Sequence, residues 1–366
     1  MNATIVPMYE AQLPSDWTYI LNDSQCNTLF CATESIFRQV HKEVLPNTPS
    51  VESCLCLNGE GEGSFSAAMA NVQEPASIMK PTKEDLATLI YTSGTTGRPK
   101  GVELTHENMA VNVSSAFQTL VGDSDLTFDS ERSLAFLPWA HSYGQTCELW
   151  GMMSQGGSMG ICRGIPHILE DLQNVKPTVL FGVPILYKRV FDGVHNVMET
   201  ASPIRKTLMR RALTMGRRRV EADTGARGPL GLMERLQSGA LDSLVLSKIR
   251  ARFGGQLRHA FVAGAACPVE VIRFMDDIGI PLCEGYGLTE TSPIVAINAP
   301  ANRLPGSVGQ CIEGVSVYIM NGGVEVATGE EGEICCVGPN VMKGYHNNPE
   351  ATADVISVAP DGKSRM

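Results

Sequence analysis

The segment 92–100 carries side chains suited to holding a polyphosphate. Gly94 and Gly97 allow positive φ and let backbone N–H groups approach an anion. Lys100 adds a compact positive charge for the β- and γ-phosphates. Hydroxyl groups that can donate to phosphate oxygens stand on Thr92, Ser93, Thr95 and Thr96. These residue types predict a loop that binds a nucleoside triphosphate.

The order of residues in this loop differs from that of the P-loop NTPases. In those proteins Gly-Lys-Ser/Thr opens a helix, whereas here Pro99 precedes Lys100 and an extended segment is expected at 101–104. The alternative is a flexible Ser/Thr/Gly hairpin without a ligand. Chance disfavours it, because eight fixed positions, each filled at about one in fifteen, arise on the order of once in a billion starts.

The elements around the loop alternate between strand and helix. Strands are predicted at 4–8, 28–31, 51–57, 87–91, 134–138, 158–162 and 178–183. Helices are predicted at 15–22, 34–44 and 107–120, the last with Thr105 as its N-cap. The alternation predicts an α/β fold of stacked, mostly parallel sheets with flanking helices.

The pattern changes after residue 298. Strands are predicted at 315–320, 324–327 and 333–337, with a tight turn at Asn321-Gly322. We therefore expect an α/β core over 1–300, made of two subdomains that divide near 165–175. A small antiparallel β-subdomain is expected over 301–366.

Composition narrows the class of protein. The chain has 366 residues, 43% of them hydrophobic, and a net charge of −10. This excludes wholesale disorder and disfavours a general nucleic-acid binder. No apolar stretch reaches the roughly 18–20 residues of a membrane span, and residues 1–10 lack a secretion signal. A cytoplasmic protein is expected, with its 11 cysteines reduced. The histidines and cysteines show no metal-ligand spacing.

The segment 203–222 reads as a basic amphipathic helix. Ile204, Leu208, Ala212 and Met215 fall on one face, and seven Lys and Arg residues accompany a single Glu. Such a helix either packs on the body of the protein with a solvated charged face, or contacts an anionic membrane or the phosphates of an acyl-CoA. Both interpretations stay open.

The string from Tyr91 to Gly101 is the signature of the AMP-forming adenylating superfamily, which includes acyl-CoA synthetases, beetle-type luciferases and peptide-synthetase adenylation domains. The chain resembles this superfamily over nearly its whole length. Further matching segments follow in the expected order, at 136–142, 263–268, 284–293, 332–334, 338–345 and 348–352.

The resemblance implies roles for the matched residues. Tyr286 is expected to stack on adenine, Thr289 to contact the α-phosphate and Glu290 to hold Mg²⁺. His141 is expected to steer the carboxylate, which makes His141, Lys100 and Thr289 the candidate catalytic residues. The expected nucleotide-binding residues are Thr92, Ser93, Gly94, Thr95, Thr96, Gly97, Lys100, Gly264, Ala265, Glu284, Gly285, Tyr286, Gly287 and Thr289.

The sequence allows other interpretations of some of these residues. His141 could be a buried histidine at a helix start. Glu284 and Glu290 could form a glycosidase carboxylate pair, which the shared Gly-Tyr-Gly turn and Thr289 disfavour. Lys343 resembles a catalytic amine but is read as a surface lysine.

The resemblance also bears on the ends of the chain. The family's next motif is Thr-Gly-Asp, followed by a hinge and a mobile C-terminal domain with an essential lysine, and none of these precedes Met366. Residues 6–10 resemble an internal segment of the family. The expectation is a fragment without the N-terminal layer and the C-terminal domain. Such a fragment would bind ATP at most weakly and show little turnover by itself.

The resemblance implies ATP-dependent activation of a fatty acid to acyl-AMP and then to acyl-CoA, with ATP, Mg²⁺ and coenzyme A. The segment 141–150 and the insertion around 190–250 look most like long-chain fatty acyl-CoA synthetases. Two alternatives remain. One is another adenylating ligase, for aryl acids or of the luciferase type. The other is a non-catalytic relic that binds nucleotides or acyl groups.

Overall fold

The computed structural model describes residues 3–72, 77, 79–92, 97–121, 129–358 and 364–366. These residues fall into two units. The first contains residues 1–109 and 341–366, and the second contains residues 110–340. The domain boundaries predicted near 165–175 and 301 stay predictions.

The first unit begins with a small α/β segment. Its elements are α1 (Pro14–Ser24), β1 (Thr28–Cys31), α2 (Glu34–Glu43), a 3-10 turn (Leu45–Asn47), β2 (Ser53–Cys56) and α3 (Phe65–Ala70). β1 and β2 pair in parallel, from Thr28 opposite Ser53 to Cys31 opposite Cys56. Trp17, Leu21 and Val40 pack against this pair because each helix turns its apolar side toward it.

An antiparallel sheet forms the rest of the first unit. It contains β3 (Leu86–Thr92), β4 (Lys100–Thr105) and β15 (Gly344–Tyr345), and α12 (Pro349–Val355), β16 (Ser357–Val358) and β17 (Ser364–Arg365) follow. Ile90, Val102 and Leu104 are buried in its core. The strand predicted at 4–8 is reduced to one parallel bridge between Ile5 and Thr88.

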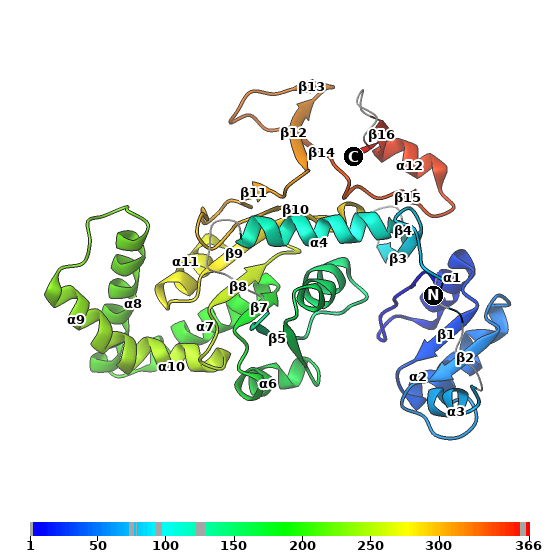
Figure 1. Cartoon of the computed structure of the whole chain (residues 1–366). Helices are drawn as coiled ribbons and strands as arrows, with labels where there is room; N and C mark the ends of the chain where they lie inside the picture. The colour runs from blue at the N-terminus through cyan, green and yellow to red at the C-terminus, as the bar shows by residue number, and fades with distance from the viewer. Residues whose placement is uncertain (1–2, 73–76, 78, 93–96, 122–128, 359–363) are drawn as a thin grey trace. The chain divides into compact units, whose positions relative to one another are not determined.

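The second unit is built around a sheet with three parallel strands, β7 (Val179–Gly182), β8 (His259–Val262) and β9 (Leu282–Gly287). β10 (Ile294–Ile297) and β11 (Gln310–Cys311) extend it antiparallel. β5 (Arg132–Ala135) and β6 (Ser158–Ile161) form a separate parallel pair. Figure 1 shows β7, β8 and β9 in green to yellow, with helices beside them.

The helices of the second unit either lie beside this sheet or pack on other helices. In chain order they are α4 (His106–Val121, mostly in this unit), a π-helix (Tyr143–Trp150), α5 (Gly151–Ser154), a 3-10 turn (Ile165–His167), α6 (Ile168–Val175), α7 (Pro184–Thr200), α8 (Pro203–Asp223), α9 (Leu232–Leu241), a second π-helix (Asp242–Leu246), α10 (Ser247–Arg250), a 3-10 turn (Ala251–Phe253), α11 (Val269–Asp277) and a 3-10 turn (Thr289–Thr291). Of these helices, α8 and α9 pack on each other (Figure 1). Tyr187, Phe253 and Ile272 lie fully buried between helices and sheet. Among the described helices, none has the length and apolarity that a membrane span requires.

A small antiparallel sheet follows in the second unit. β12 (Ser316–Asn321) pairs with β13 (Val324–Glu325) and with β14 (Glu333–Val337). The predicted α/β class, its parallel strands and this antiparallel sheet are confirmed. The N-cap at Thr105 is also confirmed, because its hydroxyl accepts a hydrogen bond of 3.1 Å from the Asn108 N–H.

The first π-helix buries a carboxyl group. Glu148 is fully buried, and desolvation raises the pKa of its carboxyl group to about 8. The protonated form is therefore the one that folding favours near neutral pH.

We expect Glu148→Gln to become more stable than the wild type as pH rises. Because folding raises this pKa above its ordinary value, the stability contributed by the proton is present in acid and is lost between about pH 4.5 and pH 8. The difference should grow by at most about 1.4 kcal/mol per pH unit, measured by urea unfolding at several pH values. The exposed Glu330→Gln is the control. A constant difference between Glu148→Gln and the wild type from pH 5 to pH 8 would contradict this.

Candidate functional site

The loop predicted to bind phosphate joins β3 and β4, which form a hairpin. Thr92 ends β3 and pairs directly with Lys100, the first residue of β4. Gly97 has φ of +119°, a backbone conformation that favours glycine, and is exposed. Ser93, Gly94, Thr95 and Thr96 lie outside the described residues. The structure therefore describes the base of the loop and leaves its phosphate contacts as predictions.

Aromatic side chains hold the base of the hairpin. The Lys100 ammonium lies 4.8 Å from the centre of the Tyr345 ring, a cation–π contact. Tyr19 donates a hydrogen bond of 3.0 Å to the Pro99 carbonyl, and its ring meets Tyr91 edge to face at 6.2 Å. Gly101 suits this close packing, because a Cβ there would lie 3.0 Å from the Tyr91 ring, which is tighter than ordinary van der Waals contact. Sequence reasoning missed Tyr19 and assigned no role to Tyr345, which lies in the matched segment 338–345; both come from parts of the chain distant from the loop.

In the second unit, small residues line the carboxyl ends of β8 and β9. Gly264 follows β8 with φ of +85°, and residues 264–266 are exposed. Gly285 lies on β9, where an added Cβ would stand 3.9 Å from that of Ala263. The turn at 263–266 and the Gly-Tyr-Gly segment are thus neighbours. Ligands of open α/β sheets bind at this edge, and an exposed backbone with small side chains can receive a flat ring.

Tyr286 and Gly287 form the corner that ends β9. Tyr286 is partly exposed and pairs with Ala296 on β10, and desolvation raises the pKa of its phenol. A Cβ on Gly287 would lie 1.7 Å from the Pro293 carbonyl oxygen, so only glycine fits there. That carbonyl accepts a hydrogen bond of 3.0 Å from the Leu288 N–H. The corner is therefore fixed by backbone contact.

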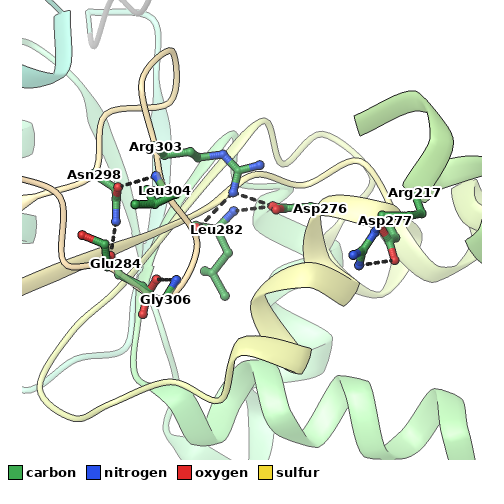
Figure 2. Close-up of polar contacts among 10 residues, drawn as sticks. Arg217, Asp276, Asp277, Leu282, Glu284, Asn298, Arg303, Leu304 and Gly306 are labelled. Carbon is green, nitrogen blue, oxygen red and sulfur yellow. Dashed lines mark hydrogen bonds and ion pairs between the residues drawn. The ribbon is translucent and has the colours of Figure 1, made fainter. Parts of the chain in front are cut away.

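Glu284 precedes this corner and has a structural partner. Figure 2 shows its carboxylate accepting a hydrogen bond of 2.7 Å from the Gly306 N–H. Desolvation raises the pKa of Glu284, and the Gly306 contact opposes that shift. The Asn298 side chain accepts from the Leu304 N–H at 2.9 Å nearby. Glu284 therefore ties β9 to the following loop, and its predicted contact with the nucleotide stays a prediction.

Thr289 joins two of the predicted motifs. It is buried, and its hydroxyl lies 3.1 Å from the Ser142 hydroxyl, the residue after His141. The structure thus brings the segments 136–142 and 284–293 together, although 147 residues separate Ser142 from Thr289 in the sequence. Glu290, the next residue, is half-buried beside this contact.

His141 is held as a hydrogen-bond donor. Its side chain is exposed, which excludes the fully buried alternative. Its Nδ1 accepts a hydrogen bond of 3.1 Å from the Tyr143 N–H, so the neutral imidazole carries its proton on Nε2. Desolvation lowers the pKa of His141, which favours this neutral form. Gly144 completes the turn, because a Cβ would lie 2.5 Å from the Pro138 carbonyl oxygen.

Two buried asparagines support the corner, and sequence reasoning assigned a role to neither, although Asn340 lies in the matched segment 338–345. The Asn112 side chain donates to the carbonyls of Thr291 at 3.2 Å and Ile294 at 2.7 Å. Asn340 donates to the same two carbonyls at 3.1 and 3.2 Å. For Asn112, the signal in the sequence was an Asn on a helix face shared with Met109, Val113 and Ala116.

The donor set limits which metal could bind. No group of three or more His, Cys, Asp or Glu side chains that could hold a metal occurs in the described part of the chain. Mg²⁺ needs no such cage, because it binds through one or two carboxylates together with phosphates and water. The single carboxylate of Glu290 therefore fits Mg²⁺ carried by a nucleotide.

Comparisons with known proteins agree with this arrangement. A family model described as AMP-binding enzyme matches residues 1–346. The peroxisomal long chain acyl-CoA synthetase 7 of Arabidopsis thaliana is 28% identical over 96% of this chain and 50% of its own length. The long-chain-fatty-acid–CoA ligase FadD15 of Mycobacterium bovis is 31% identical over 98% of this chain and 58% of its own length. The chain thus spans about half to three-fifths of these relatives.

Solved structures share the fold. Apo MatB from Rhodopseudomonas palustris superposes with a TM-score of 0.69 at 24% identity, covering 99% of this chain and 62% of MatB. The anthranilate CoA ligase AuaEII, in complex with anthranoyl-AMP, gives a TM-score of 0.72 at 19% identity, covering 99% of this chain and 61% of AuaEII. At these identities the likeness establishes the architecture alone.

We predict that Asn112→Ala and Asn340→Ala are coupled. Each variant removes one of the two side-chain donors to these carbonyls, and we expect it to lower the free energy of unfolding by about 1–3 kcal/mol. The double variant removes both side-chain donors and should lose at least about 1 kcal/mol more than the sum. Denaturant unfolding measures this, with the exposed Asn196→Ala as control. If the losses in free energy of unfolding were strictly additive, the two amides would act independently, which would contradict the prediction.

Proposed function

The chain belongs to the AMP-binding enzyme family, and from this premise we propose that it serves an ATP-dependent acid–CoA ligase. A carboxylate oxygen attacks the α-phosphorus of ATP, the bond to the β-phosphate oxygen breaks, and acyl-AMP and pyrophosphate form. The thiol of coenzyme A then attacks the acyl carbon, loses its proton and displaces AMP. Adenylation supplies the leaving group that a free carboxylate lacks.

The contact between Thr289 and Ser142 is the observation that carries this proposal. It joins the segment with the candidate adenine and phosphate residues to the segment with the candidate carboxylate residue, inside one unit. Thr289 would contact the α-phosphate while His141 donates its Nε2 proton to the carboxylate as a neutral group. A neutral donor positions the carboxylate without the strong ion pair that would lower its nucleophilicity.

The remaining roles concern charge. Lys100 would neutralise the β- and γ-phosphates, and Glu290 would hold Mg²⁺, which supplies further neutralisation of the phosphates when bound. Tyr286 offers an aromatic face to adenine beside the exposed turn at 264–266. The expectation that Lys100 and Tyr286 serve one nucleotide stays a prediction.

We propose a long-chain fatty acid as the substrate. Two relatives that match nearly the whole chain are named for long-chain acids. Aryl acids are the second candidate, because AuaEII is an anthranilate CoA ligase with the same architecture.

We expect Lys100→Ala and Glu290→Gln each to weaken Mg-ATP binding about 10- to 100-fold, since each removes a charge-assisted contact worth roughly 1.5–3 kcal/mol. Titration calorimetry measures the affinity. Lys83→Ala is the matched control, because Lys83 pairs with Glu107 at 2.9 Å and is mostly exposed. Unchanged affinity in both variants would reject the roles given to Lys100 and Glu290.

We further expect palmitate to stimulate slow exchange of labelled pyrophosphate into ATP, in keeping with the little turnover expected from the sequence, whereas anthranilate does not stimulate it. Exchange with anthranilate alone would favour the aryl-acid ligase. Binding of ATP without exchange for any acid would favour the non-catalytic alternative and overturn the proposed activity of this chain.

A further inference from the structure

The helical segment 203–252 differs in charge from the rest of the chain. It contains 12 Lys and Arg residues and four Asp and Glu residues, a net charge of +8, whereas the whole chain carries −10. The segment covers α8, α9, the second π-helix and α10. Such segregation concentrates a positive potential on one part of an acidic protein.

Ion pairs inside the second unit use only part of this charge. Arg217 pairs with Asp277 through two hydrogen bonds of 2.6 and 2.9 Å, which Figure 2 shows. Arg218 pairs with Glu234 at 3.2 Å and Arg219 with Asp242 at 3.5 Å. Ala212 and Met215 are buried beneath them. The packing interpretation of 203–222 therefore holds for the C-terminal half of α8.

The other cations of the segment have no acidic partner. No ion pair within the described residues involves Arg205, Lys206, Arg210, Arg211, Arg235, Lys248 or Arg252. Arg211, Arg235, Lys248 and Arg252 are exposed. Of the four acidic residues of the segment, Glu234 and Asp242 are paired with arginines, whereas Glu221 and Asp223 take part in no ion pair within the described residues. With seven unpaired cations against these two carboxylates, the free charge of the segment is positive.

An apolar face on α9 accompanies this charge. Leu232, Met233 and Leu236 are 76%, 68% and 62% exposed. At about 100° per residue they lie within one third of the helix circumference. Glu234, which pairs with Arg218 of α8, lies on the opposite side. α8 and α9 lie side by side (Figure 1), so the apolar face points away from α8.

We propose that the exposed apolar residues Leu232, Met233 and Leu236, with the neighbouring cation Arg235 on α9, dock on an anionic lipid membrane, and that the unpaired Lys248 of α10 adds to the attraction. Three large apolar side chains beside positive charges match the boundary between lipid headgroups and acyl chains. Charge complementarity selects an anionic membrane over a neutral one. The docking would hold the protein at the surface in which long-chain acids dissolve, yet it requires neither ATP nor acid.

The test is co-sedimentation of the full chain with vesicles of phosphatidylcholine containing about one third phosphatidylglycerol, a content sufficient for a negative surface potential. We expect binding at least tenfold tighter than to phosphatidylcholine alone, and its loss on raising salt from about 0.05 to about 0.5 M. Equal binding to both vesicles, or none, would overturn the proposal.

Matched variants separate this surface from general charge. Arg235→Glu with Lys248→Glu should weaken binding by about 25-fold or more, since each cation near an anionic surface contributes about fivefold. Lys42→Glu with Lys80→Glu changes the net charge equally on exposed residues elsewhere and should have little effect. Equal losses in the two double variants would reject docking through this surface.

The apolar part has its own control. Met233→Asp with Leu236→Asp should weaken binding about tenfold or more, whereas Ile165→Asp, at a residue 72% exposed, should not. Circular dichroism and Mg-ATP binding check that each variant is folded.

Sedimentation velocity without vesicles tests whether a second copy of the chain occupies this face instead. A dimer abolished by Met233→Asp with Leu236→Asp would show that a second copy of the chain occupies this face and would overturn the lipid assignment.

Discussion

The carbonyl groups of Thr291 and Ile294 are the point on which the candidate site depends. Both lie close in sequence to the corner at Tyr286 and Gly287, and both receive hydrogen bonds from Asn112 and Asn340; these bonds are buried at Thr291 and partly buried at Ile294. A buried carbonyl without a donor costs about 1–3 kcal/mol. By satisfying these groups, the two asparagines fix the turn that presents Thr289. Thr289 in turn contacts Ser142, so the position of His141 follows from hydrogen bonds made on the other side of the corner.

The parts of the site that the sequence could predict are those in which one residue type alone satisfies the physics. Gly287 is such a position, because any side chain would collide with the Pro293 carbonyl. The strand β3 was predictable for a similar reason, because a short, mostly apolar run of residues indicates a strand that is buried in a sheet. Asn112 was not predictable, because its acceptors lie 179 and 182 residues away and an asparagine within a helix has no fixed meaning. The contact of Lys100 with Tyr345 depends on a pairing between β4 and β15 that no local pattern announces.

Two titratable side chains in the segment after Pro138, those of His141 and Glu148, are held in their neutral forms by desolvation. Desolvation lowers the pKa of His141 and raises that of Glu148, so both side chains are neutral near pH 7. This segment can therefore orient a carboxylate through hydrogen bonds without attracting or repelling it strongly. In the proposed reaction the positive charge comes from Lys100 and from Mg²⁺, both directed at the phosphates. The division separates positioning of the nucleophile from stabilisation of the leaving group, and each is served by different residues.

Charge is distributed unevenly along the chain, so the net charge of −10 does not describe the potential at each part of its surface. The segment 203–252 carries +8, so the remaining residues carry −18. Salt screens charges over about 10 Å at 0.1 M, and an approaching surface therefore senses the nearest residues far more than the average. An acidic protein can bind an anionic membrane through such a segment, while its acidic remainder is repelled and turned away. The same reasoning applies to ATP and coenzyme A, the proposed substrates, which are also anions. In the proposed function they would need local cations such as Lys100 within an acidic body.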